Sequence, residues 1–344
     1  MAKTGVLLVN LGTPDSPSVP DVRKYLREFL MDERVIDIPF LNRWLLVNLI
    51  IAPFRAPKSA KIYQEVWLPN GSPLKVYGLS NEKVLGEELG SEYVVRLAMR
   101  YQNPSIPAVL AEMEKMYLKK IIVIPFFPQY ASATSGSVHQ KVMETVKTWQ
   151  NIPEIVFAGD FYKHPLLVQG FADNAGKFLQ NNSYEHYVFS YHGLPERQTV
   201  KAHHGKTCSE LGCEEGITEQ NYACYKAQCF ETTRLLAEKL GLSKEMYTTC
   251  FQSRLGKEVW IQPYTEDVVK ELAGKGIKKV LAFSPAFVAD CLETTIEVGE
   301  EYKEMFIELG GEQWDLVESL NDTPIWIELL KDLVKTYDQP SVFR

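Results

Sequence analysis

Short apolar runs alternate with longer amphipathic stretches along almost the whole chain. The apolar runs are rich in β-branched and aromatic residues, and helix-length sequence separates each run from the next. This pattern predicts βαβ units, in which helices join buried parallel strands. The predicted strands are Val6–Asn10, Val94–Met99, Lys120–Pro125, Ile155–Phe157, His186–Ser190, Met246–Phe251, Val280–Phe283 and Trp314–Val317.

A weak internal repeat indicates that the strands form two related halves. Residues 119–125 (KKIIVIP) resemble residues 278–285 (KKVLAFSP), and each segment follows a helix-like stretch. We expect an α/β fold of two Rossmann-like domains, each a four-stranded parallel sheet flanked by helices, facing each other across a cleft. The predicted domains are residues 1–163 and 164–321. The second carries a cysteine-rich insert at about 198–229, and a last helix at about 322–344 is expected to pack back on the first.

Composition narrows the class of protein. Of the 344 residues, 45% are hydrophobic and 24% are charged, as in soluble globular proteins, and the length suits two domains. The net charge of −7 argues against a general nucleic-acid binder. We identify no signal peptide and no apolar run of about 18 residues, so we expect a cytoplasmic protein.

The segment Phe40–Phe54 is apolar nearly all round, yet Asn42, Arg43 and Asn48 interrupt it. One interpretation is a core helix. The other is an exposed apolar lip, flanked by cations such as Arg55, that touches a membrane surface or an apolar ligand. The second interpretation would place the protein at the inner face of a membrane.

Polar and aromatic side chains follow several predicted strands directly. In parallel sheets, ligands bind beyond the carboxyl ends of the strands. His192 stands at such an end, where Gly193 and Pro195 prevent a regular helix, although it could simply hydrogen-bond a turn. The first half contributes a mostly apolar and aromatic set that suits a large flat ligand with carboxylates. This set is Leu11, Arg100, Tyr101, Tyr130, Ser132 and Thr134.

The second half adds a row of carboxylates. Glu293, Glu297, Glu300 and Glu304 follow one another at spacings of four, three and four residues, which predicts one face of an α-helix. A solvated acidic face at a helix start is one interpretation. A track that delivers cations towards His192 is the other.

These segments resemble ferrochelatases. Ser190–Pro195 (SYHGLP) is similar to the family's catalytic histidine motif, Phe251–Arg254 to the next block, and Phe287–Glu297 to the block with the catalytic glutamate. Leu8–Pro14, Arg100-Tyr101 and Pro128–Tyr130 resemble the N-terminal blocks. The blocks follow the family order over nearly the whole chain.

The resemblance implies insertion of Fe²⁺ into protoporphyrin IX with loss of two pyrrole protons. His192 would accept a proton or bind the metal, Glu293 would be a second base or metal ligand, and Glu297 would stand behind it. Leu11, Tyr101, Trp260 and Phe287 would grip the macrocycle, and Arg55, Arg100 and Ser132 are candidates for its propionates. Cys291 replaces a histidine found in some members, which puts a third imidazole at the metal site in doubt.

Several alternatives remain open at this point. Coproporphyrin could replace protoporphyrin as the substrate, or cobalt or nickel could enter another tetrapyrrole. A two-domain solute-binding protein is the non-enzyme alternative. The sequence does not decide between a monomer and a homodimer.

The predicted insert contains Cys208-x4-Cys213-x10-Cys224-x4-Cys229, together with His203 and His204. Four thiolates in this pattern could hold a [2Fe–2S] cluster, as in some bacterial ferrochelatases, or zinc, or could remain free thiols. Any cluster here would be structural or regulatory, because metallation transfers no electron.

Overall fold

The structure is a computed structural model that describes residues 3–254, 256 and 258–339. It divides into two compact units. Unit 1 comprises residues 1–127, 131–159 and 322–344, and unit 2 comprises residues 128–130 and 160–321. The last part of the predicted C-terminal segment, residues 340–344, lies outside the described residues.

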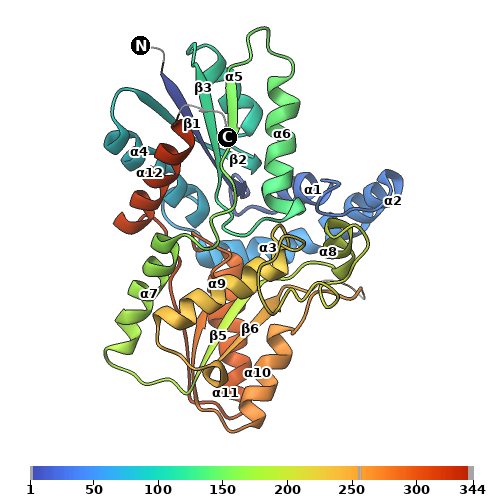
Figure 1. Cartoon of the computed structure of the whole chain (residues 1–344). Coiled ribbons are helices and arrows are strands. Elements are labelled where there is room, and N and C mark those ends of the chain that lie inside the picture. Colours follow the sequence, from blue (N-terminus) through green and yellow to red (C-terminus); the bar gives the residue numbers. More distant parts are fainter. Residues whose placement is uncertain (1–2, 255, 257, 340–344) are drawn as a thin grey trace. The chain divides into compact units, whose positions relative to one another are not determined.

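Each unit is built on a four-stranded parallel sheet, and this confirms the predicted fold class (Figure 1). The strand orders are β2-β1-β3-β4 and β6-β5-β7-β8, so the two sheets have the same topology. The first sheet contains β1 (Thr4–Gly12), β2 (Tyr93–Tyr101), β3 (Lys120–Pro125) and β4 (Glu154–Phe157). The second contains β5 (His186–His192), β6 (Tyr247–Gln252), β7 (Lys279–Phe283) and β8 (Gln313–Leu316).

Helices cover both faces of the first sheet because its strands are apolar on both sides. Helices α5 (Ile106–Glu114) and α6 (Ser137–Val146) pack on one face and share a core with β1 and β3. On the other face lie α4 (Pro73–Leu89) and α12 (Pro324–Asp338), where Trp326 is fully buried against Phe126. The remaining helical elements of unit 1 are α1 (Val19–Leu30), α2 (Phe40–Leu45), the π-helix η1 (Leu46–Ile51), α3 (Ala52–Val66) and the π-helix η2 (Ser132–Gly136).

The second sheet is covered in the same way. Helices α10 (Thr265–Gly274) and α11 (Tyr302–Glu308) share a core with β5, β6 and β7. Helices α7 (Pro165–Leu179) and α9 (Tyr225–Lys239) pack together, and the Tyr191 hydroxyl meets Thr233 of α9 at 3.0 Å on the other face. Unit 2 also contains α8 (Glu196–Ala202), the 3-10 helix η3 (Lys244–Met246) and the π-helix η4 (Glu293–Glu301).

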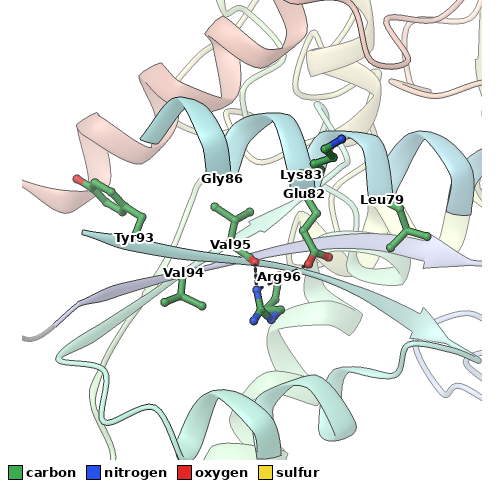
Figure 2. A pocket seen from close by; sticks show the side chains of 8 residues that line it. All are labelled: Leu79, Glu82, Lys83, Gly86, Tyr93, Val94, Val95 and Arg96. Carbon is green, nitrogen blue, oxygen red and sulfur yellow. Dashed lines mark hydrogen bonds and ion pairs between the residues drawn. The ribbon is translucent and has the colours of Figure 1, made fainter. Parts of the chain in front are cut away.

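A hollow runs between α4 and the edge strand β2 in unit 1 (Figure 2). The Glu82 carboxylate accepts the Leu97 main-chain N–H at 2.8 Å, so α4 satisfies a donor that an edge strand would leave open. None of the predicted site residues lines this hollow. Its lining residues are Leu79, Glu82, Lys83, Gly86, Tyr93, Val94, Val95 and Arg96.

The segment 40–54 forms α2, η1 and the start of α3 and exposes much of its apolar surface. The exposed large side chains are Phe40, Leu41, Trp44, Leu45, Leu49, Ile50 and Phe54. We call this set the apolar lip. Arg43 does not flank it as a free cation, because its guanidinium is buried and donates to the Ile36 and Ile38 carbonyls.

Candidate active site

The candidate site of unit 2 is built at the carboxyl ends of β5 and β6 and at the start of η4. His192 is the last residue of β5 and pairs in register with Gln252, the last residue of β6. The Gln252 amide nitrogen donates to the Glu293 carbonyl at 2.7 Å and to the Glu297 carboxylate at 3.0 Å. Gln252 therefore joins the strand end that carries His192 to the helix that carries the glutamates.

Hydrogen bonding selects which ring nitrogen of His192 can react. Nδ1 lies 2.7 Å from the Gly193 carbonyl oxygen, and because a carbonyl only accepts, Nδ1 must donate. In the neutral ring, Nε2 then carries the lone pair. The part of the chain that the structure describes offers Nε2 no hydrogen-bond partner, so it can accept a proton or bind a metal.

The chain turn after His192 depends on glycine. A Cβ at Gly193 would lie 2.7 Å from the Gln252 carbonyl oxygen, closer than any side chain tolerates. The main-chain N–H of Gly193 donates to the same oxygen at 2.9 Å. Tyr225, the first residue of α9, donates its hydroxyl to the His192 carbonyl at 2.8 Å. These contacts fix the imidazole on the end of its strand.

Two aromatic rings lie near the imidazole. The ring centroids of Trp260 and Phe287 each lie 6.5 Å from that of His192. Trp260 is held by a β-bridge to Pro195, and Phe287 lies in the turn after β7, where its N–H donates to the Ser284 carbonyl. Both rings are half-buried, and flat apolar faces beside an open imidazole suit a planar aromatic ligand.

Glu293 and Glu297 differ in how freely they can act. The Glu297 carboxylate accepts hydrogen bonds from the Ser253 amide at 2.8 Å and from the hydroxyls of Ser253 and Tyr302. With the amide of Gln252, these contacts occupy both oxygens of Glu297. The partner of Glu293 among the described residues is the buried thiol of Cys291, and burial together with the Glu293 charge raises the pKa of that thiol.

The helix η4 corrects the predicted spacing of the acidic row. The segment is π-helical, with main-chain hydrogen bonds between residues i and i+5, so the predicted α-helical face through Glu300 is wrong. Glu301 lies close enough to Glu297, Glu304 and Glu300 for their charges to interact. Reduced hydration and then the charge of Glu297 raise the pKa of Glu301. The π-helix itself left no signal in the sequence, because its spacings are also compatible with an α-helix.

The other predicted porphyrin contacts have separate environments. Leu11 and Ser132 are half-buried in unit 1, where Ser132 accepts a hydrogen bond from Arg34 at 2.8 Å, and Arg55 is exposed.

Arg100 pairs with Asp32, and Tyr101 is completely buried and donates its hydroxyl to the same carboxylate. In unit 2, the Tyr130 main-chain N–H donates to Gln228 at 2.7 Å. Porphyrin contacts by Arg100 and Tyr101 remain predictions, and the low exposure of these two side chains does not support them.

A second group of ligand-type side chains lies between α8 and α9. The ligand atoms of His203, Cys208, Cys213 and Cys224 all lie within 4.8 Å of one another, and all four residues are buried. The sequence identified three of these cysteines and left His203 and His204 unassigned. The group could hold a metal ion.

The two sheets have the same topology, and an open imidazole and a carboxylate follow the strand ends of the second sheet. Solved structures share this fold: SirB from Bacillus subtilis with Fe³⁺ aligns with a TM-score of 0.56 at 13% identity, over 98% of this chain and 97% of that one. The sirohydrochlorin chelatase SirB from B. subtilis subspecies spizizenii, in complex with cobalt, aligns with a TM-score of 0.55 at 11% identity over the same shares. These likenesses show the fold alone.

The chain belongs to the ferrochelatase family, whose model matches residues 3–337. A ferrochelatase of Coxiella burnetii (strain Dugway 5J108-111) is 43% identical over 97% of this chain and 93% of its own length. One of Legionella pneumophila (strain Lens) is 44% identical over 96% of this chain and 98% of its own. The predicted family and activity are thereby confirmed. The protein is a metal-chelating lyase of haem formation, with Fe²⁺ and a porphyrin as substrates.

Among the described helices, none combines the length and the apolar character needed to cross a bilayer.

Proposed function

We propose that the chain inserts Fe²⁺ into protoporphyrin IX at the ends of β5 and β6, with His192 and Glu293 as the reacting side chains. The observation that carries this assignment is the fixed imidazole of His192. Its Nδ1 donates to the Gly193 carbonyl, its Nε2 has no hydrogen-bond partner among the described residues, and the rings of Trp260 and Phe287 lie nearby.

The reaction exchanges two pyrrole N–H protons for one Fe²⁺. His192 Nε2 accepts a proton from the porphyrin or holds the incoming ion, and the Glu293 carboxylate serves as the second base or ligand. Glu297 is a fixed anion behind Glu293, because its oxygens already accept four hydrogen bonds. It positions Gln252 and Ser253 and adds negative charge near the incoming cation.

Leu11, Trp260 and Phe287 are proposed to contact the faces of the macrocycle, and Arg55, Tyr130 and Ser132 to contact its rim. Exposed Arg55 is suited to a propionate, because a guanidinium binds a carboxylate in a bidentate manner. Arg55→Ala should raise KM for the porphyrin about 10-fold with little change in kcat, because an interaction of equal strength in the ground and transition states does not affect the chemical step.

Protoporphyrin is favoured over coproporphyrin because it carries fewer carboxylates and unit 1 presents the apolar lip. Purified protein should be given each porphyrin with Fe²⁺ under anaerobic conditions, and the loss of porphyrin fluorescence followed. We expect kcat/KM to be at least about 10-fold higher for protoporphyrin. A higher value for coproporphyrin would reverse the substrate assignment.

The apolar lip is proposed as a peripheral membrane contact through which an apolar porphyrin arrives, at the inner face of a cytoplasmic membrane. Seven large side chains there are between 41% and 72% exposed, more apolar surface than single scattered residues leave. Co-sedimentation with phosphatidylglycerol vesicles should be lost when Phe40, Leu41 and Phe54 are changed to Ser. Unchanged sedimentation would contradict the contact.

The chain is also proposed to form a homodimer, and light scattering on the purified protein would give its mass in solution.

The predicted [2Fe–2S] cluster takes no part in this chemistry, because metallation transfers no electron.

A further inference from the structure

The loop between α8 and α9, residues 203–224, consists of turns and contributes little to either large core. Its apolar contacts form a small cluster of Cys208, Cys213, Cys224 and Ala227, with Leu211 and Ile217 beside it. Such a cluster is too small to order more than 20 residues by burial alone. The loop needs another source of stability.

His203 points to that source. The side chain is only 6% exposed, and neither ring nitrogen has a hydrogen-bond partner among the described residues. A buried imidazole with two unsatisfied nitrogens is costly unless another group occupies the space beside it. The sulfurs of three buried thiols lie within 4.8 Å of one another and of a nitrogen of this ring.

Cys229 does not belong to this group. Its thiol is buried on α9, and Tyr225 is its side-chain partner. Relative to the four cysteines predicted from spacing, the structure replaces Cys229 with His203. The donor set is therefore three thiols and one imidazole.

We propose that His203, Cys208, Cys213 and Cys224 bind a single Zn²⁺ ion in a tetrahedral site. A tetrahedron with Zn–S bonds of about 2.3 Å places its sulfurs roughly 3.8 Å apart. The Cys208 and Cys224 sulfurs are 3.8 Å apart. Three thiolates and one imidazole are a known donor set of structural zinc, and with four protein ligands no position is left for a substrate.

The geometry does not fit the predicted [2Fe–2S] cluster. In that cluster two ligands bind each iron, and the bridging sulfides separate the two ligand pairs. Here all four ligand atoms lie within 4.8 Å of one another, which suits one central ion. Zinc binding would release the thiol protons and would convert binding free energy into order of the loop.

The site is connected to the active site by one residue. Cys224 precedes Tyr225, whose hydroxyl donates to the His192 carbonyl at 2.8 Å. An ion at Cys224 therefore fixes the start of α9 and, through Tyr225, the strand end that carries His192. This consequence rests on the proposed function, whereas the zinc site itself does not.

The test is metal analysis of the purified full-length protein. We expect about one zinc per chain and no inorganic sulfide, as a closed four-ligand site requires. His203→Ala and Cys213→Ser should lower the zinc content at least about 10-fold. The matched controls are exposed His204→Ala and Cys229→Ser, which should keep the metal. His203→Cys should regain zinc, which separates loss of a ligand from loss of the fold.

Cobalt substitution gives a readout independent of activity. The Co²⁺ protein should show thiolate-to-cobalt charge transfer and the intense ligand-field bands of a tetrahedral ion, and His203→Ala should lose them. Two irons with two sulfides per chain would overturn the zinc assignment, as would a folded chain without metal. Zinc that survives in His203→Ala and is lost in Cys229→Ser would overturn the ligand set.

Discussion

The carboxyl ends of the two sheets have the same backbone arrangement. They differ in which side chains remain available to a ligand. Gly12 pairs with Tyr101 at the end of the first sheet, as His192 pairs with Gln252 in the second. The residue after each second strand has a left-handed backbone, with φ of 64° at Gln102 and 65° at Ser253. Each donates its N–H to a glutamate, Gln102 to Glu28 and Ser253 to Glu297.

In unit 1 the Asp32 carboxylate is satisfied by its neighbours. Asp32 accepts from Arg100, Tyr101 and Ser137, and the side chains of Arg100 and Asp32 are only 11% and 6% exposed. Burial alone would raise the pKa of Asp32. These hydrogen bonds and the Arg100 charge outweigh that effect and hold the pKa below its usual value. In unit 2, His192 stands where unit 1 has glycine, and its Nε2 stays open. The same backbone arrangement therefore occurs in both units, and a few side chains at the strand ends of unit 2 make that unit reactive.

Loss of the open imidazole should have the largest effect. His192→Ala should lower kcat by at least about 10³, because general bases contribute 10²–10⁴ and a metal ligand is removed as well. Porphyrin affinity, measured by fluorescence titration, should change less than about threefold, because the aromatic walls remain. His204→Ala is the exposed control. A variant with near-normal turnover would show that the active end of unit 2 is misassigned.

Glu293→Gln should lower kcat by about 10², less than the histidine change, because the amide keeps its shape and loses only charge and basicity. The control is Glu300→Gln, which the π-helix places outside the row. If both variants slow anaerobic Fe²⁺ insertion equally, Glu293 has no specific role, and the glutamates act only through their combined negative charge.

A change at the strand ends of unit 1 should lower the stability of the fold and leave the activity nearly unchanged. Asp32→Asn leaves the buried Arg100 without its partner and should reduce the free energy of unfolding by about 3–5 kcal/mol in urea titration. The rate per folded molecule should stay within about twofold. If turnover collapsed at unchanged stability, the strand ends of unit 1 would share in the chemistry, and the contrast would fail.

The other histidine of β5 should affect only the pH dependence of stability. Burial lowers the pKa of His186 to about 4, below the unfolded value of 6.5. The unfolded chain therefore takes up the proton first, and stability falls as pH drops from about 6.5 to 4, by up to roughly 3 kcal/mol. His186→Gln should flatten this part of the urea midpoint profile. An unchanged slope would contradict the burial of a neutral ring.

The fold was predictable because strand and helix periodicities are local. The pattern from Val6 to Val317 located every strand, with ends that differ by up to two residues. His192 and Glu293 could be singled out because each follows a strand end. Their partners depend on contacts between distant segments, so the hydrogen bonds that occupy Glu297 and the burial of Tyr101 could not be read from spacing.

The cysteine segment shows the same limit. Four cysteines at regular spacings predicted a four-thiolate site, and the structure groups three of them with His203. Cys229 lies on α9, where its thiol is buried beside Tyr225 and Tyr191. Spacing identifies which side chains could bind a metal, but the direction of each side chain decides which ones do.

The central claim is that His192 and Glu293 together form the site that receives the incoming metal. Anomalous diffraction at the iron edge from an anaerobic crystal soaked with Fe²⁺ measures this directly. The account predicts a peak within bonding distance of both His192 Nε2 and a Glu293 carboxylate oxygen. Iron found only on exposed carboxylates such as Glu300 and Glu304, with none at His192, would contradict it.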